Sequence, residues 1–433
     1  MDSFDSLDFF TDDSVANDPY PYYEHLRARC PVQPTGHHEV VAVTGYAEAA
    51  QIYRDNASFS ACNVVAGPFL RFPVELEGDD VSEVIEKNRG FIPQNDHIVT
   101  MDPPLHTRER GLLMGLMTPK RLKENESFIW RLADRQLDEF IDDGECEFVS
   151  AYAQPYSMLV IADLLGVPEA DHRRFRDGFG MAANKIAQNL SADSPSGQAP
   201  APEEMNSLSW LYDWFAGYVE ERRVAPRDDV LTQLAQAKYP DGSTPEVMAV
   251  AHQAAILFAS GGETTARLLS TALVYLAEYP GLQDRLRAEP GLVPNFVEEC
   301  LRIESPIKTD FRLVKRSTRL AEVDLAAGTP VAMLLGAANR DPKQFESPNE
   351  FRADRPNSRE HLAFGRGIHS CPGGPLARSE GRISIERILA RTRDIRLSEA
   401  HHGPAADRHF EYEPTWLLRA LHGLHIEFTP AAG

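Results

Sequence analysis

A glycine-rich loop near the C-terminus, residues 364–373, constrains the fold of this chain more than any other stretch. It reads Phe-Gly-Arg-Gly-Ile-His-Ser-Cys-Pro-Gly, so that two glycines precede Cys371 and another follows it. Glycines at this density interrupt regular structure and let the backbone approach a bound group closely. Backbone amides, together with Arg366 and His369, would favour the thiolate of Cys371, which is the metal-binding form of cysteine. Taken alone, the loop is also compatible with a tight turn around an inert cysteine.

A second unusual stretch lies inside a long predicted helix. The helix has a typical start at residues 244–246 (Thr-Pro-Glu) and a typical end at Tyr279-Pro280. Between them, residues 259–265 read Ala-Ser-Gly-Gly-Glu-Thr-Thr. Two adjacent glycines inside a helix cost about 1 kcal/mol each relative to alanine. We therefore expect the backbone to open there, with a threonine hydroxyl bonded back to a carbonyl. The alternative is a site where another helix crosses closely.

Two charged motifs are weaker signals. His106 and Arg110 are four residues apart in a helix that is predicted to start at a proline pair, so they share one face. Glu299 and Arg302 are three residues apart, and Arg355 follows later in an Ala-Asp-Arg-Pro segment. Alone, each motif is typical of a solvated charged face or a surface ion pair.

Together these stretches resemble the cytochrome P450 family, whose motifs occur in the same order. The family's loop pattern is Phe, two residues, Gly, three residues, Cys, one residue, Gly, and Phe364, Gly367, Cys371 and Gly373 occupy its fixed positions. The resemblance runs from about Asp18 to the C-terminus. It implies a mainly α fold with a small β lobe, in which a haem lies between a long central helix and the cysteine-ligand loop. Residues 18–433 would form one haem domain without a fused reductase, and the acidic residues 1–17 are expected to be frayed.

The resemblance also implies a cofactor and its ligands. The cofactor would be haem b (iron protoporphyrin IX) with the Cys371 thiolate as axial ligand, and O2 would be the co-substrate. The cofactor-binding residues would be His106, Arg110, Gly261, Arg312, Phe364, Gly367, His369, Cys371 and Gly373. Of these, His106, Arg110 and Arg312 would reach the haem propionates. Glu299, Arg302 and Arg355 would form a buried structural network.

The central helix would supply the catalytic residues. Thr264 and Glu263 match the family's acid–threonine pair and would relay protons from solvent toward O2. Ser260 stands where the family usually has Ala or Gly, and it adds a hydroxyl near the distal pocket. The candidate substrate contacts are Phe258, Ser260, Ile307, Lys308, Thr309 and Asp310. Asp310 could instead pair with Arg312.

Composition excludes several other classes of function. The formal net charge of −21 argues against nucleic acid as a partner. No apolar run approaches the roughly 20 residues that span a bilayer, and the N-terminus lacks the features of a secretory signal. The five cysteines have no paired spacing, which fits a reducing compartment. We therefore expect a cytoplasmic enzyme without nucleic-acid or membrane partners.

The sequence thus predicts a haem-thiolate monooxygenase. It would insert one oxygen atom of O2 into an apolar small organic molecule, with electrons from NAD(P)H through separate ferredoxin and ferredoxin reductase proteins. The alternatives are a peroxide-driven peroxygenase of the same fold, which Glu263 and Thr264 disfavour, and a non-catalytic haem-binding or sensor protein. Helices at 173–190 and 210–223, joined by residues 191–204, would form a lid over the substrate. The ferredoxin would dock on a basic patch over the cysteine loop that consists of Arg108, Lys120, Arg121, Lys123, Arg366 and Arg378.

Pro372 distinguishes the loop of this chain. Proline has no N–H, so position 372 cannot donate a hydrogen bond to the Cys371 sulfur. The remaining candidate donors are the amides of Gly373 and Gly374, since Pro375 also lacks an N–H. We expect the thiolate to be a strong electron donor to iron and the resting reduction potential to be low. The alternative is that the proline only stiffens the turn.

Overall fold

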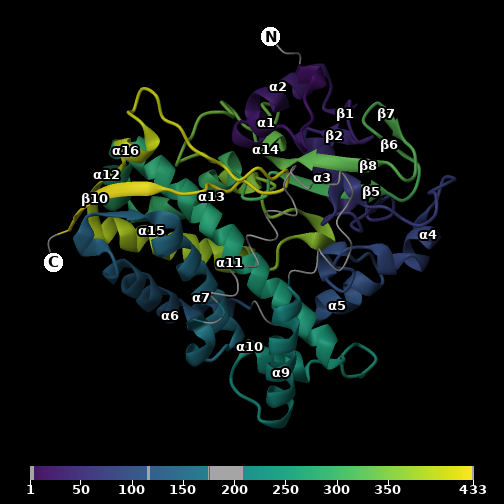
Figure 1. The fold of residues 1–433 in the computed structure, drawn as a ribbon, viewed down its shortest axis with the longest axis horizontal. Helices are drawn as coiled ribbons and strands as arrows, with labels where there is room; N and C mark the ends of the chain where they lie inside the picture. The colour runs from purple at the N-terminus through teal and green to yellow at the C-terminus, as the bar shows by residue number, and fades with distance from the viewer. Residues whose placement is uncertain (1–3, 115–117, 174, 176–207, 432–433) are drawn as a thin grey trace.

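The structure, a computed structural model, describes residues 4–114, 118–173, 175 and 208–431. A long helix, α11 (Val247–Glu278), crosses the middle of the molecule diagonally (Figure 1). It begins close to the predicted start and ends where Pro280 opens the next helix, α12 (Pro280–Ala288). More than half of its side chains are buried, because other helices cover most of its faces. Several other helices pack directly against α11.

The glycine pair in α11 marks a helix crossing. The helix is continuous through Gly261 and Gly262, so the expected opening of its backbone is wrong. A Cβ atom on Gly261 would lie 3.2 Å from Cγ1 of Ile161, and one on Gly262 would lie 3.5 Å from Cα of Met158. Both neighbours belong to α7 (Gln154–Leu165). The glycines therefore permit the close approach of α7, which was the alternative interpretation of the sequence.

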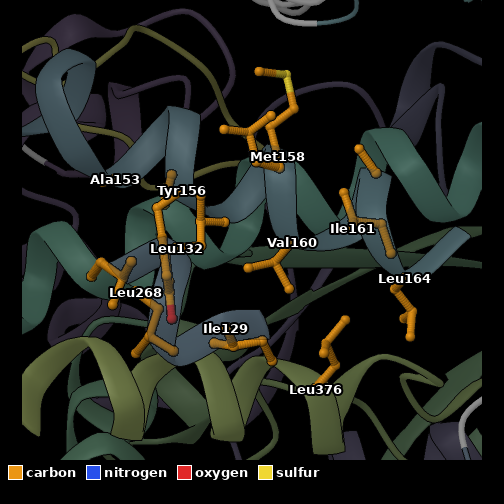
Figure 2. Close-up of a cluster of buried hydrophobic side chains, with 14 of the residues drawn as sticks. Ile129, Leu132, Ala153, Tyr156, Met158, Val160, Ile161, Leu164, Leu268 and Leu376 are labelled. Carbon is orange, nitrogen blue, oxygen red and sulfur yellow. The ribbon is translucent and has the colours of Figure 1, made fainter. Parts of the chain in front are cut away.

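Four helices meet in the largest hydrophobic core. The helices α6 (Pro119–Asp138) and α7 pack on each other, and both α7 and α15 (Gly374–Arg391) contact α11. The start of α6 is capped, since the Thr118 side chain accepts a hydrogen bond from the amide of Arg121. Figure 2 shows side chains that fill this core, among them Ile129, Tyr156, Leu268 and Leu376.

A five-stranded sheet forms the small β lobe beside the helices (Figure 1). Its strands, in spatial order, are β1 (Val32–Pro34), β2 (Val41–Val43), β8 (Pro330–Leu334), β5 (Thr309–Val314) and β3 (Phe59–Ser60). The pair β2–β8 is parallel and the other pairs are antiparallel. Successive side chains of a strand point to opposite faces. In β5, Asp310 and Arg312 therefore face one side, whereas Thr309 and Phe311 face the other.

The N-terminal segment packs against the body of the protein. Phe9 and Phe10 are 6% and 5% exposed, and Val15 in α1 (Asp13–Asn17) is buried as well. The ring centroid of Phe10 lies 6.1 Å from that of Trp416 near the C-terminus. The expectation that residues 1–17 are frayed is therefore wrong for residues 4–17. Aromatic residues within an acidic segment supply enough apolar surface to hold it in place.

The remaining elements complete the fold. The other helices are α2 (Tyr20–Arg29), α3 (Tyr46–Arg54), α4 (Ser82–Lys87), α5 (Leu105–Met114), α9 (Ser209–Val224), α10 (Val230–Gln236), α13 (Val293–Ile303), α14 (Leu335–Ala338) and α16 (Glu399–His402). The other strands are β6 (Thr318–Leu320) and β7 (Val323–Leu325), which pair with each other, and β4 (Glu145–Glu147), β10 (His425–Pro430) and β9 (Thr392–Leu397), which form a third sheet. Helix α9 corresponds to the predicted helix at 210–223, whereas most of 173–190 and all of 191–204 lie outside the described residues. Within the described ranges, no helix is long and apolar enough to cross a membrane.

Candidate functional site

A cavity of about 300 Å³ lies between α11 and the loop that carries Cys371. Its lining is mostly apolar. The residues from α11 are Ile256, Leu257, Ser260, Gly261, Thr264, Thr265 and Leu268. The residues from the cysteine loop and α15 are Ala363, Phe364, Gly365, His369, Cys371, Pro372, Gly373, Leu376, Ala377 and Glu380. The rest of the lining consists of Tyr53, Val64, Ile98, Val99, Arg110, Ile161, Leu301, Pro306, Ile307, Asp310, Arg312, Leu335 and Leu417.

The cysteine loop depends on a glycine with a left-handed backbone. Gly367 has φ of +70°, and a Cβ atom at this position would collide with the carbonyl oxygen of Tyr53. The loop closes on itself through the amide of Cys371, which donates to the carbonyl of Phe364 at 2.8 Å. This bond brings Phe364 and Cys371 to the same wall of the cavity. Gly367 itself does not line the cavity, so its contribution is to the shape of the loop.

Opposing influences act on the Cys371 thiol. Cys371 lines the cavity and is exposed on the side that faces it. Burial raises the pKa of the thiol. Hydrogen bonds from the amides of Gly373 and Gly374 and the positive charges of Arg110 and Arg378 lower that pKa in part. A metal cation bound to the sulfur would lower the pKa of the thiol further, because a thiol that coordinates a metal is deprotonated outright.

One edge of the cavity carries an excess of positive and polar nitrogen groups. Arg110 and Arg312 line it, and His106 lies beside them with its ring centroid 4.1 Å from that of His369. Burial and the two arginines lower the pKa of His106 to about 4, and similar influences lower the pKa of His369 to about 2. His106 is 1% exposed, yet neither of its ring nitrogens has a hydrogen-bond partner among the described residues.

These features fit a haem. Its two propionate carboxylates would supply acceptors for the unpartnered His106 and negative charge for the two arginines. The flat apolar macrocycle would lie between Phe364 and Leu376 on one wall and Gly261 on the other, all of which line the cavity. Cys371 is the thiol on that lining and could be the axial ligand.

Asp310 belongs to the same edge. Its carboxylate accepts hydrogen bonds from Arg312 Nη1 at 3.0 Å and from the Tyr53 hydroxyl at 2.8 Å. Burial and the nearby Asp310 raise the pKa of Tyr53, so this phenol remains a donor. Of the two interpretations of Asp310, the pair with Arg312 is therefore the one that the geometry favours. No motif pointed to Tyr53, which comes from α3, 257 residues before Asp310 in the chain.

Helix α11 presents a hydroxyl and a nearby carboxylate. Thr264 lines the cavity, and its Oγ1 donates to the carbonyl of Ser260 at 2.8 Å, which is the predicted back-bond. Glu263 does not line the cavity. Its Oε1 pairs with Arg267 Nη2 at 2.6 Å, and the same nitrogen lies 3.7 Å from Glu413 Oε2. The two residues of the expected relay are thus adjacent in sequence but face different surroundings.

Glu299, Arg302 and Arg355 meet in a fully buried network. The Glu299 carboxylate accepts from Arg302 Nε and Nη2, each at 2.8 Å, and from Arg355 Nε at 3.0 Å. The amide of Arg352 donates to it as well, at 3.0 Å. Both guanidinium groups also donate to the carbonyl of Glu350. The network therefore ties α13 to residues 346–355, the segment that leads toward the cysteine loop.

The structure separates the candidate substrate contacts into two groups. Ser260, Ile307 and Asp310 line the cavity, whereas Phe258, Lys308 and Thr309 do not. The expectations for Thr309 and Lys308 are wrong for different reasons. Thr309 points to the opposite face of β5 from Asp310, whereas Lys308 precedes the strand, where its amide donates to the carbonyl of Leu417 and its side chain is buried away from the cavity lining. Lys308 is 3% exposed, and burial lowers its pKa to about 7.

Phe258 is the third expectation that the structure corrects. The cavity-facing stripe of α11 runs through Leu257, Gly261 and Thr264, which follow the spacing of one helix face. Phe258 lies outside that stripe. Its ring centroid is 5.0 Å from that of Phe175 and 6.1 Å from that of Phe215 in α9, so it is part of the hydrophobic core.

The comparisons with known proteins agree with this geometry. Residues 217–393 match the family model described as cytochrome P450. The chain is 33% identical to cytochrome P450 144 of Mycobacterium tuberculosis over 91% of this chain and 87% of that protein. It is 31% identical to 6-deoxyerythronolide B hydroxylase of Saccharopolyspora erythraea over 88% of this chain and 90% of that protein.

A solved structure extends the match across the fold. Substrate-free cytochrome P450 CYP150A6 of Mycobacterium marinum superposes with a TM-score of 0.91 at 54% identity, covering 99% of this chain and 100% of that chain. The chain therefore belongs to the cytochrome P450 family and is a haem-thiolate monooxygenase of the bacterial type.

Proposed function

We propose that this enzyme inserts one oxygen atom of O2 into a neutral, apolar small organic molecule. The cofactor is haem b with the Cys371 thiolate as axial ligand, and the electrons come from NAD(P)H through separate ferredoxin and ferredoxin reductase proteins. The observation that carries the proposal is that Cys371 and Thr264 line the same largely apolar cavity from opposite sides. The scattered, unpaired cysteines favour a cytoplasmic location.

The residues of the cavity edge would bind and orient the cofactor. His106, Arg110, Arg312 and His369 would hold its carboxylates, and the amides of Gly373 and Gly374 would hydrogen-bond to the Cys371 sulfur. When bound, the haem supplies the redox chemistry that activates O2. The apolar walls exclude water, so the polar groups that remain in the cavity interact in a medium of low dielectric constant.

Protons would reach O2 through α11. Thr264 Oγ1 can accept a hydrogen bond from a protonated group in the cavity while its own hydrogen is donated to the carbonyl of Ser260. Glu263 is the adjacent carboxylate and would deliver protons from solvent. Since Glu263 is paired with Arg267 at 2.6 Å, this role requires the carboxylate to leave that ion pair during the cycle.

The names of related proteins support an apolar substrate. A Bacillus megaterium relative, CYP109E1, is 29% identical with a TM-score of 0.77, and its structure was solved in complex with testosterone. The Saccharopolyspora erythraea relative is named a hydroxylase of 6-deoxyerythronolide B. In this chain, α11 contributes two leucines and an isoleucine to the lining, and such a wall suits molecules that are as apolar as these two compounds.

The test is reconstitution of the complete electron-transfer chain. Purified enzyme, ferredoxin, ferredoxin reductase and NADH are mixed under O2 with a ligand that shifts the spin state of the ferric protein. We expect NADH consumption to be coupled to an oxygenated product that carries label from ¹⁸O₂. Product formation with peroxide alone, at a similar rate, would favour a peroxygenase. Ligand binding without any product under either condition would favour a haem sensor.

A further inference from the structure

The Ser260 hydroxyl has no hydrogen-bond partner among the described residues, although it lies in the middle of a mostly buried helix. Thr264 and Ser270 on the same helix each donate their hydroxyl to the carbonyl four residues earlier, at 2.8 and 2.9 Å. Such back-bonding is the usual way for a helical hydroxyl to be satisfied away from water. Ser260 lines the cavity and is exposed there, between the buried residues Ala259 and Gly262. Its hydroxyl is therefore available to a bound molecule.

The surroundings of Ser260 offer little else to a polar ligand atom. Its neighbours on the cavity-facing stripe of α11 are Ile256, Leu257 and Gly261, which have no polar side-chain atoms. Thr264 is the next hydroxyl along this face, but its hydrogen is already donated to the Ser260 carbonyl. Thr265 also lines the cavity from α11 but is only 3% exposed. Of the three α11 hydroxyls on the described lining, Ser260 is therefore the exposed one whose hydrogen is free to donate, whereas Thr264 can only accept.

The charged residues of the lining are engaged elsewhere. Asp310 accepts from Arg312 and Tyr53, and Arg110 donates to the carbonyl of Ser370. Glu380 comes from α15, on the same wall as Cys371, and burial raises its pKa, which favours the neutral acid. A charged substrate would therefore find no counter-ion beside Ser260 on the described walls.

We infer that Ser260 determines specificity by donating a hydrogen bond to a carbonyl oxygen of the substrate. The inference rests on the proposed function and narrows its substrate class to neutral apolar ketones, lactones or esters. A hydrocarbon that covered Ser260 would remove water from the hydroxyl and leave it unpaired, which is unfavourable. A carbonyl oxygen would replace that water. Sites built to hydrogen-bond a substrate discriminate against analogues that lack the polar atom.

The experiment measures ligand affinity rather than turnover. Dissociation constants are determined from the spin-state shift of the ferric holoenzyme for two matched pairs, menthone with p-menthane and 5α-androstan-3-one with 5α-androstane. In the native enzyme, we expect at least one ketone to bind more tightly than its hydrocarbon. In Ser260→Ala, that ketone should bind roughly 3- to 10-fold more weakly, which is the range for one neutral hydrogen bond. The hydrocarbon should bind equally well or more tightly.

Two further variants separate hydrogen bonding from shape. Ser260→Thr keeps the hydroxyl and should retain the preference for the ketone. Ile256→Val removes one methylene from the same stripe without a change in polarity, and it should alter the affinities for both members of a pair by the same factor. The inference is overturned if Ser260→Ala leaves the ketone-to-hydrocarbon ratio unchanged, or if Ile256→Val changes that ratio as much as Ser260→Ala does.

The proposed function can fail separately. If the native enzyme distinguishes ketone from hydrocarbon through Ser260 but forms no oxygenated product in the reconstituted system, then the inference about recognition holds and the proposed monooxygenation does not. If product forms but the ratio is independent of Ser260, the monooxygenase is supported and the assignment of Ser260 is wrong.

Discussion

Restoring an amide at position 372 should raise the reduction potential of the bound iron. The Cys371 sulfur accepts hydrogen bonds from the amides of Gly373 and Gly374, and these bonds lower the pKa of the thiol. Pro372 stands between them and the sulfur in sequence but has no hydrogen to donate. In Pro372→Leu, a third amide becomes available close to the thiolate. Each such bond withdraws electron density from the sulfur and favours the reduced iron.

The expected magnitude follows from one hydrogen bond. A typical net value is about 1 kcal/mol. For a one-electron couple, in which ~59 mV corresponds to a tenfold change in equilibrium constant, this is roughly 40 mV. The assay is a spectroelectrochemical titration of the ferric/ferrous couple in the native enzyme and in Pro372→Leu, without substrate. We expect the midpoint of the variant to be higher by about this amount.

Two controls make the result interpretable. Ile368→Leu changes an apolar side chain of the same loop without altering the number of amides, and its midpoint should match that of the native enzyme. The carbon-monoxide difference spectrum of each variant reports whether thiolate ligation and the loop are intact. If Pro372→Leu keeps the thiolate spectrum and its midpoint is unchanged or lower, then the missing amide does not tune the iron.

Three other predictions concern the remaining parts of the site. In Thr264→Ala, NADH should still be consumed but should yield peroxide in place of product, and unchanged coupling would remove Thr264 from the proton relay. Glu299→Gln leaves the buried Arg302 and Arg355 without a carboxylate and should destabilise the protein by about 3–5 kcal/mol in urea unfolding; a loss below about 1 kcal/mol would mean that the network behaves like a surface pair. The rate of electron transfer from ferredoxin should fall as the salt concentration rises. The native Lys120 side chain is 86% exposed, and at a given salt concentration Lys120→Glu should be slower than the native enzyme. A rate that does not depend on salt would contradict docking on the basic patch.

The basic patch also illustrates how ion pairs limit prediction from sequence. The Arg121 side chain is 16% exposed, and its Nη2 lies 3.8 Å from Oδ1 of Asp228. Arg378 Nε donates a hydrogen bond to Oε1 of Glu298 at 2.6 Å. Both partners are distant in sequence, so the number of basic residues overestimates the charge that a ferredoxin would encounter. Among the described residues, Lys120 pairs with the exposed Glu124, whose Oε1 lies 3.7 Å from Lys120 Nζ, and such an exposed i,i+4 pair is weak, which makes Lys120 the better test of the patch.

Local signals predicted the central part of the site well. The bounds of α11 follow from the proline-containing segments at its two ends, and the shape of the cysteine loop follows from Gly367, whose left-handed backbone few other residues adopt. These features are encoded within a few residues of where they act. The back-bond from Thr264 to the Ser260 carbonyl was predictable for the same reason.

Features that depend on tertiary contacts were not predictable in this way. The glycine pair of α11 indicated an unusual backbone, but its cause is the approach of Ile161 and Met158 on α7. Whether Lys308 or Ile307 faces the cavity depends on the pairing of this segment with residues 417–418, where Ile307 bridges Leu418 and the amide of Lys308 donates to the carbonyl of Leu417, and a single sequence does not reveal that pairing. The packing of Phe10 against Trp416 joins opposite ends of the chain.

The identity of the iron ligand is the central claim, and the carbon-monoxide difference spectrum of the reduced protein tests it most directly. The native enzyme should show the band that is characteristic of thiolate-ligated haem. Cys371→Ser should lose that band together with activity, whereas Cys30→Ser, a cysteine outside the cavity lining, should retain both. A Cys371→Ser variant that binds haem and keeps the native spectrum and activity would contradict the account.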